Sequence, residues 1–371
     1  MSAPLVTLSP SGLHVPSADL HIDPWGPSER AIITHGHSDH ARGTARHVLT
    51  AESGVGILGV RLGAEASVEG VAFGERIRVG DATISLHPAG HILGSAQVRI
   101  ESGGEVWVVT GDCKRQPDPS AEAFEVVRCH TLISECTFGL PVYRWPDPES
   151  VMEEVMTWWE AGAAEGRNVL LGAYALGKAQ RVLAHLARIG DRAGGGFPGP
   201  ILVHGAVERL LPPYLARGIR LPAVSRATPE TVKAAAGRAL VVAPPSAAGT
   251  PWARKLDPFS LGVASGWMKL RGTRRRRAAD RGFVLSDHLD WPDLLATISE
   301  TGAQRVGLTH GTTGPAVRYL QEQGLDAWSL PTRFEGEAED ADEVDVADEG
   351  GEAGADEADE VSRADTAEPA P

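Results

Sequence analysis

The sequence predicts an α/β fold that is made of two kinds of unit. Up to about residue 140, short apolar segments alternate with glycine turns, as in residues 76–86, which is typical of strands in one half of a β-sheet sandwich. From about Asp147 the apolar period becomes that of helices separated by strands, which favours a parallel α/β unit. After about Ser265 we expect the chain to return and complete the first unit.

Apolar periodicity places the elements of the middle unit. We expect helices at residues 148–160 and 176–189, and strands at 169–171, 201–204 and 240–243. The expected boundaries are 1–145 for the first part of the sandwich domain, 146–264 for the insert, 265–334 for the return segment and 335–371 for a tail.

The net charge of −14 belongs almost entirely to this tail. Residues 335–371 hold 16 acidic residues against Arg363 alone, with almost no large apolar side chain, so we expect disorder. As a hypothesis, the tail mimics nucleic acid and competes for a basic surface; a solubilising appendage is the favoured alternative.

Length and composition bound the class of protein. A chain of 371 residues with 42% hydrophobic residues can build two domains with sizeable cores. It has no run of 18 apolar residues and no charged-then-apolar leader, so we expect neither a membrane span nor export. Cys113, Cys129 and Cys136 lack CxxC spacing and are expected to be small apolar residues in a reducing cytoplasm.

Four potential metal ligands lie within six residues: His35, His37, Asp39 and His40. They follow the apolar residues 31–34, so we expect them on a loop at the C-terminal end of a buried strand. Imidazole and carboxylate together suit zinc or a neighbouring first-row ion. A polar loop of histidines that only hydrogen-bond one another is disfavoured, because they would charge and repel on acidification.

Further candidate ligands follow other expected strands. Each alone is more often a capped turn or a satisfied core residue, but their common position at strand ends favours one shared site. These residues are His91, Asp112, Glu135, His288 and His310.

Taken together, these residues resemble the motifs of the metallo-β-lactamase superfamily, and within it the β-CASP nucleases. The segments PAGHILGSA, VTGDCK, SECTFG, AYALGKAQ, SGWM and LSDHLDW are most similar to those of bacterial ligase-associated DNA exonucleases. The resemblance runs from about Leu20 to about Leu330 and implies an αββα sandwich with an inserted β-CASP α/β domain.

The resemblance also implies two divalent metal ions, zinc or alternatively manganese. Such cations, about 3.5–4 Å apart, activate a shared water and stabilise both the attacking and the leaving oxygen of a phosphoryl displacement. The implied ligands are His35, His37 and His91 for one ion, Asp39, His40 and His310 for the other, and Asp112 as the bridge.

The implied general acid is His288, with Glu135 accepting its hydrogen bond, because a nearby carboxylate favours the imidazolium form. Asp287 is a further possible partner for this proton. Asp23 is better interpreted as a brace for the His35 loop than as a ligand.

Several residues are candidates for contact with nucleic acid. Lys178 lies in a GxxxxGK pattern followed by Ala179, so ATP binding is not expected there. The lysine could face a substrate phosphate, and a solvated lysine at the start of a helix is an equally favoured alternative. Trp267 is placed to stack on a base, although tryptophans are more often core residues. A basic run that could bind a phosphate backbone comprises Arg271, Arg274, Arg275, Arg276, Arg277 and Arg281.

We therefore expect a metal-dependent DNA exonuclease of DNA repair. The alternatives are an RNA-processing β-CASP ribonuclease, a small-molecule metallo-hydrolase and a non-catalytic nucleic-acid-binding scaffold. His310 keeps the RNA alternative open, because the resemblance associates histidine at this motif with RNA-acting relatives. The family association implies an ATP-dependent DNA ligase and a helicase as partners.

Overall fold

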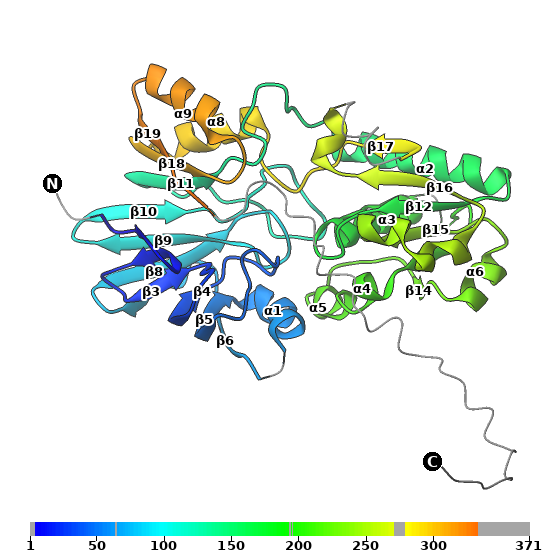
Figure 1. The fold of residues 1–371 in the computed structure, drawn as a ribbon, viewed down its shortest axis with the longest axis horizontal. Coiled ribbons are helices and arrows are strands. Elements are labelled where there is room, and N and C mark those ends of the chain that lie inside the picture. The colour runs from blue at the N-terminus through cyan, green and yellow to red at the C-terminus, as the bar shows by residue number, and fades with distance from the viewer. Residues whose placement is uncertain (1–3, 64, 193, 195, 271–278, 333–371) are drawn as a thin grey trace, which may run out of the picture.

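The structure is a computed structural model that describes residues 4–63, 65–192, 194, 196–270 and 279–332. The expected acidic tail and Arg271, Arg274, Arg275, Arg276 and Arg277 lie outside the described residues. The described elements form three sheets in a mixed α/β arrangement (Figure 1).

The first sheet contains six strands in chain order. Strand β4 ends at Ile32, so the loop that begins near His35 leaves this sheet at a strand end, as expected. The strands are β1 (Thr7–Ser9), β2 (Gly12–Val15), β3 (Leu20–Ile22), β4 (Ser28–Ile32), β5 (Ala45–Ala51) and β6 (Ser67–Val71).

The second sheet has the order β19-β18-β11-β10-β9-β8-β7 and so incorporates the returning chain. Strand β18 pairs in parallel with β11, with Glu135 opposite Thr309, which brings Glu135 and His310 to the same sheet edge. The strands are β7 (Ile77–Val79), β8 (Ala82–Pro88), β9 (Ala96–Ser102), β10 (Glu105–Val109), β11 (Thr131–Glu135), β18 (Arg305–Thr309) and β19 (Asp326–Ser329).

These two sheets pack face to face, with helices on both outer faces. Ile22 and Ile32 of the first sheet share a core with Ile84 and Val98 of the second. On the outside of the first sheet lie the 3₁₀ helix η1 (Glu52–Gly54) and helix α1 (Val55–Leu62); on the outside of the second lie α8 (Trp291–Thr301) and α9 (Thr313–Glu322). The layers are therefore helix, sheet, sheet, helix (Figure 1).

The third sheet belongs to the insert and is parallel throughout, in the order β14-β13-β15-β12-β16-β17. Its strands are β12 (Asn168–Gly172), β13 (Ile201–Val203), β14 (Ser225–Arg226), β15 (Leu240–Ala243), β16 (Phe259–Ala264) and β17 (Arg281–Phe283). Its helices are α2 (Pro148–Ala164), α3 (Lys178–Arg192), α4 (Gly205–Glu208), α5 (Leu211–Ala216), α6 (Pro229–Ala235), and the 3₁₀ helices η2 (Pro245–Gly249), η3 (Pro251–Leu256) and η4 (Gly266–Lys269).

The insert agrees with the expected elements but is longer than predicted. Helix α2 begins at Pro148 because the Asp147 side chain accepts a hydrogen bond from the Ser150 amide. Strand β17 pairs with β16, so the sheet continues past the predicted boundary at residue 264. Strand β17 has only three residues, which is too short for the apolar alternation that predicts a strand from sequence.

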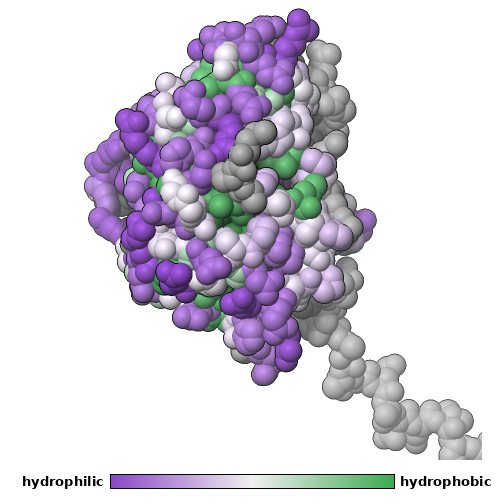
Figure 2. Space-filling model, turned by 90° about the vertical axis from the view of Figure 1, so that its left-hand side faces the viewer, coloured by the Kyte–Doolittle hydropathy of each residue, from purple (hydrophilic) through white to green (hydrophobic). Residues whose placement is uncertain are grey.

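One face of the molecule is largely covered by hydrophilic residues. Figure 2 shows one face on which hydrophobic residues gather only in small, separate patches among hydrophilic ones. Within the described part of the chain, no helix combines the length and apolar character needed to cross a membrane.

Candidate metal centre

Asp23 holds the loop that carries the four clustered ligands. Its two carboxylate oxygens accept hydrogen bonds from the Thr34 amide at 2.7 Å and the Thr34 hydroxyl at 2.6 Å. The second oxygen also accepts a hydrogen bond from Nδ1 of His40 at 2.8 Å. Asp23 is therefore bonded to Thr34, at the start of the loop, and to His40, one of its potential ligands.

Three imidazoles converge beside this loop. Nδ1 of His37 lies 3.1 Å from Nε2 of His35 and 3.0 Å from Nε2 of His91. Oδ2 of Asp112 lies 3.6 Å from the His35 nitrogen and 3.7 Å from the His91 nitrogen. These four ligand atoms all lie within 4.8 Å of one another, so they could hold one metal ion.

The outer nitrogens of two of these rings show that the inner nitrogens suit a cation. Nε2 of His37 lies 3.2 Å from the main-chain oxygen of Leu176, and Nδ1 of His91 lies 2.6 Å from that of Asp287. Because a carbonyl oxygen only accepts, each outer nitrogen must carry the proton, and in a neutral ring the inner nitrogen keeps its lone pair. Lone pairs that face one another at about 3 Å repel, and a bound cation removes that repulsion.

A second group shares Asp112. Oδ2 of Asp112 lies 3.5 Å from Nε2 of His40, and the ring of His40 stacks on that of His310 at 5.4 Å. His40, Asp112 and His310 form a further potential ligand group, and Oδ2 of Asp39 lies 3.5 Å from Nε2 of His40. Nε2 of His40 and Oδ1 of Asp112 are buried without a hydrogen-bond partner among the described residues, as expected of atoms that bind a metal.

The protonation of this cluster also suits a cation. Burial, together with the neighbouring His40, holds the pKa of His35 well below its usual value, and burial and His288 do the same for the pKa of His91. Burial raises the pKa of Asp112, but the charge of His40 outweighs it and leaves the pKa well below its usual range. Neutral imidazoles and an ionised carboxylate are the forms that bind metals.

His40 carries the opposite shift. Burial lowers its pKa, but the carboxylates of Asp39, Asp112 and Asp23 outweigh burial and raise the pKa well above the usual value. In the protein without metal, a proton therefore takes the place of a cation among these carboxylates.

His310 has a strained main chain. Its φ angle is +58°, in the left-handed region that non-glycine residues rarely adopt. The following Gly311 has a φ angle of +66°, and a Cβ atom there would lie 2.6 Å from the main-chain oxygen of Cys136. Such strain costs about 1–3 kcal/mol and tends to collect at functional sites, which fits a side chain that must turn toward Asp112.

His288 and Glu135 form a pair next to the shared carboxylate. Nδ1 of His288 lies 2.9 Å from both Glu135 carboxylate oxygens and 4.0 Å from Oδ2 of Asp112. The Glu135 carboxylate also accepts a hydrogen bond from the Cys113 amide at 2.9 Å. Glu135 is buried, so its charge acts on His288 with little screening by water.

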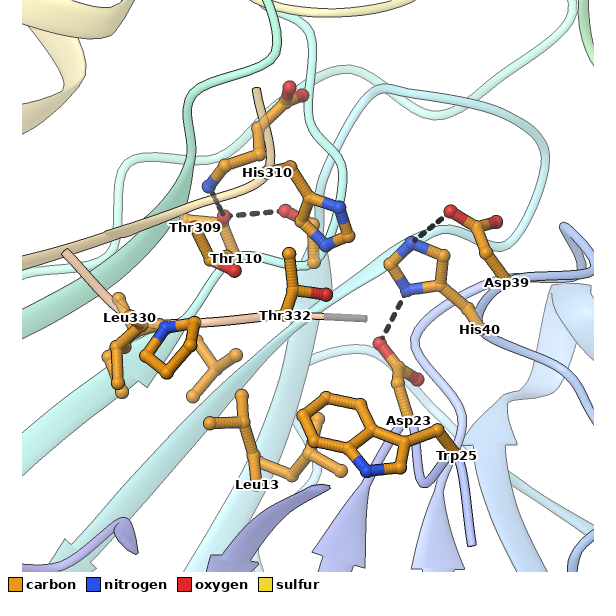
Figure 3. A pocket seen from close by; sticks show the side chains of 16 residues that line it. Leu13, Asp23, Trp25, Asp39, His40, Thr110, Thr309, His310, Leu330 and Thr332 are labelled. Atoms are coloured by element: carbon orange, nitrogen blue, oxygen red, sulfur yellow. Dashed lines mark hydrogen bonds and ion pairs between the residues drawn. The ribbon is translucent and has the colours of Figure 1, made fainter. Parts of the chain in front are cut away.

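A pocket of about 50 Å³ opens beside the second ligand group. Figure 3 shows Asp39, His40 and His310 on one side of it and Leu13, Trp25 and Leu330 on the other. The pocket therefore joins the metal centre to an apolar wall from both sheets.

The candidate nucleic-acid contacts have different surroundings. The partly exposed Trp267 packs on Phe138 with ring centres 4.7 Å apart, and Phe138 lies 5.9 Å from the His288 ring. Arg281 is partly exposed and lies 3.5 Å from Glu154. The side chain of Lys178 is completely buried and lies 3.4 Å from Asp287, so in this structure it meets a carboxylate of the protein rather than solvent.

Sequence reasoning missed several groups that orient the site. The main-chain oxygens of Leu176 and Asp287 carry no sequence signal, because every residue has one. Trp145 donates from Nε1 to the main-chain oxygen of His288 at 2.9 Å, a role that nothing in its sequence position indicates.

Comparison with known proteins gives several relatives, although no protein-family model matches the chain. A probable DNA ligase from Opitutus terrae is 32% identical over 324 residues, 86% of this chain and 30% of that protein. The transcription termination factor FttA from Thermococcus kodakarensis is 33% identical over 156 residues, 38% of this chain and 23% of the factor. The endoribonuclease YSH1 from Saccharomyces cerevisiae is 31% identical over 136 residues, 35% of this chain and 17% of the enzyme.

The termination factor and the endoribonuclease are β-CASP proteins of the metallo-β-lactamase superfamily. This chain belongs to the same β-CASP branch. The chain spans less than a third of the length of each of these three curated relatives. The fold is also similar to that in a crystal structure of a protein of unknown function from Enterococcus faecalis V583, with a TM-score of 0.53. The match covers 82% of this chain and 80% of that chain, at 14% sequence identity.

Proposed function

We propose that this β-CASP protein is a metal-dependent DNA exonuclease that acts in DNA repair in the cytoplasm. The observation that supports this most is the position of Asp112, which is shared by the ligand group of His35, His37 and His91 and by that of His40 and His310. Its Oδ2 also lies 4.0 Å from Nδ1 of His288. A metal site next to a carboxylate-paired imidazole suits hydrolysis of a phosphodiester, because the leaving sugar oxygen needs a proton.

The residues divide the work as follows. His35, His37 and His91 would hold one ion, Asp39, His40 and His310 the other, and Asp112 would bridge them. When bound, two such divalent ions, zinc or manganese, supply a nucleophilic hydroxide and stabilise charge on the phosphate. His288 would donate a proton from Nε2 to the leaving oxygen, because Nδ1 is engaged by Glu135.

Aromatic and basic side chains near His288 support nucleic acid as the substrate. Trp267 lies among the rings of Phe138 and Tyr143, so it is held in one orientation and offers a partly exposed ring for a base. The arginine run at residues 271–277, together with Arg281, follows Trp267 closely in sequence and would bind the phosphate backbone.

Digestion of end-labelled oligonucleotides tests the proposal. Metal-stripped protein resupplied with zinc or manganese is expected to shorten labelled DNA from one end, and Asp112→Ala is expected to abolish this. DNA and RNA strands of matched sequence belong in the same experiment. Release of internal fragments would contradict exonuclease action, and inactivity with every ion would contradict the nuclease assignment.

RNA processing is the second candidate. It is favoured by His310 in the second ligand group and by the similarity to the endoribonuclease. Preferential cleavage of the RNA strand in the matched assay would replace DNA by RNA in our proposal.

The remaining alternatives fit the site less well. A small-molecule hydrolase needs neither the insert nor the paired His288 and Glu135, and a non-catalytic scaffold has no physical reason to keep the metal-ligand groups intact. The DNA ligase relative supports a role beside an ATP-dependent DNA ligase, with a helicase as a further partner. Co-purification with a ligase from the source cells would test this association.

A further inference from the structure

A buried cluster of charged residues joins the insert to the metal centre. We call Lys114, Asp118, Lys178, Arg181 and Asp287 the buried ion cluster, because at most 4% of each side chain is exposed. Lys178 and Arg181 belong to α3 of the insert, whereas Asp287 immediately precedes His288.

Helix α3 holds Asp287 through two cations. Nη1 of Arg181 lies 3.0 Å from Oδ1 of Asp287 and also donates to the main-chain oxygen of Ser286. Nζ of Lys178 lies 3.4 Å from Oδ2 of the same carboxylate. The main chain and side chain before His288 are therefore both attached to the insert.

The same short segment contacts the metal centre on its other side. The main-chain oxygen of Asp287 accepts a hydrogen bond from Nδ1 of His91 at 2.6 Å. The amide of His288 donates to Oγ of Ser286 at 3.2 Å, and the His288 ring is held by Glu135. Asp287 thus links the two α3 cations to the residue that we propose as the proton donor.

Packing alone gives no reason for these charges. Burying five ionised side chains carries a large desolvation penalty, and well-packed apolar side chains would stabilise the same contact at least as well. What ionic contacts add is directional geometry, since a bifurcated guanidinium contact restrains the segment in position and orientation.

We infer that Asp287 is a positioning residue, through which Lys178 and Arg181 hold His288 in place for protonation of the leaving group. This inference rests on the proposed function. It differs from the sequence-based idea that Asp287 holds the proton of His288, because the Asp287 carboxylate faces Arg181 and Lys178.

Two substrates with different leaving groups test the inference. One is a DNA oligonucleotide, whose leaving sugar oxygen needs a proton, and the other is a thymidine p-nitrophenyl phosphodiester, whose p-nitrophenolate leaves without one. Asp287→Asn, which keeps the shape and removes the charge, is expected to lower kcat on DNA about 100-fold and on the p-nitrophenyl ester less than about fivefold. KM for DNA should change little, because Asp287 is buried away from substrate.

Asp118→Asn is the matched control, because it removes the same charge from the same cluster without touching the residues next to His288. It is expected to change kcat on both substrates by the same factor. Arg181→Lys, which keeps the buried charge, is a second variant that should show a weaker form of the Asp287→Asn pattern if Asp287→Asn does not fold. Circular dichroism and bound-metal content confirm that each variant is folded and loaded.

The outcomes are distinguishable. If the wild-type protein cleaves neither substrate, the proposed function fails and the inference fails with it. If the wild-type protein cleaves both substrates and Asp287→Asn lowers kcat by the same factor on each, only the inference is overturned. The same leaving-group dependence in Asp118→Asn would also overturn it, because the effect would then belong to the cluster as a whole.

Discussion

The main-chain oxygen of Leu176 lies 3.2 Å from Nε2 of His37, a residue 139 positions earlier in the chain. The insert therefore sets which nitrogen of a metal-ligand imidazole carries the proton, and leaves Nδ1 free to face His35 and His91. The metal centre is thus built by the sandwich and the insert together.

Gly177 follows Leu176 directly and has no room for a side chain. Its φ angle is +86°, and a Cβ atom there would lie 2.2 Å from Cγ2 of Ile92. An alanine in this left-handed conformation costs about 1–2 kcal/mol, and the clash with Ile92 adds to that cost, so we expect Gly177→Ala to lower the free energy of unfolding by more than this amount. We also expect it to weaken zinc binding at the group that contains His37. Urea unfolding and zinc titration measure the two effects. Gly218→Ala is the control, because its φ angle is +76° but a Cβ atom there meets nothing within 4 Å; equal losses in both variants would contradict the prediction.

Metal stoichiometry should follow the two ligand groups. The wild-type protein is expected to bind two zinc ions per chain, and His91→Ala one, because the first group then loses one of its three imidazoles. Equilibrium dialysis followed by metal analysis gives the count. His87→Ala is expected to keep two ions, since His87 pairs with Glu125 outside the ligand groups. Two ions in His91→Ala would contradict the proposed grouping.

His185 should make stability depend on pH. Burial, followed by the neighbouring Arg181, lowers its pKa to about 4 in the folded protein, whereas an unfolded histidine titrates near its usual value of about 6.5. Between these values the unfolded chain binds more protons, so this residue's contribution to stability is intact above pH 6.5 and is lost as the pH falls toward 4.

Lowering the pH from 7.5 to 5.0 should therefore destabilise the wild-type protein more than His185→Leu. The difference between their free energies of unfolding is expected to shift by about 1–2 kcal/mol in favour of His185→Leu. Urea unfolding of both proteins at the two pH values measures this difference. His47→Leu serves as the control, because 62% of the His47 side chain is exposed. A constant difference between wild type and His185→Leu would show that His185 titrates alike in the folded and unfolded chains.

Trp267 should contribute to substrate binding by stacking on a base. Loss of one such contact costs about 1–3 kcal/mol, so Trp267→Ala is expected to weaken binding of single-stranded DNA by about tenfold. Fluorescence anisotropy in the absence of metal measures binding without cleavage. Trp252→Ala, which removes a ring packed on His204 in the insert, should bind DNA as the wild-type protein does. Unchanged affinity in Trp267→Ala would remove this residue from the proposed interface.

The arginine run should make binding depend on salt. If Arg275 and Arg276 each neutralise a phosphate, replacing both by alanine weakens DNA binding and lowers the slope of log affinity against log salt by about 1–2. Affinities at several salt concentrations give the slope. Replacing Arg192 and Arg318 by alanine removes the same charge from exposed positions where these residues pair with Glu149 and Glu322, and should leave the slope as it is. A slope unchanged by the Arg275 and Arg276 replacements would contradict phosphate contact.

Much of this site could be predicted from the sequence because its chemistry depends on residue type and strand position. Imidazoles and a carboxylate at strand ends indicated a metal site, and the structure brings His35, His37, His91 and Asp112 within 4.8 Å. The helices and strands of the insert were likewise predictable, because amphipathic periodicity is local to each element.

Only the tertiary structure decided how those residues are oriented. The protons of His37 and His91 are directed by the main-chain oxygens of Leu176 and Asp287, and main-chain groups are identical in every sequence. The sequence allowed Lys178 to face either a substrate phosphate or solvent, whereas α3 packs it against Asp287 in the interior. Local pattern determined which chemical groups this protein has, whereas long-range packing determined which partner each group meets, because the contacts that orient them join residues more than a hundred positions apart.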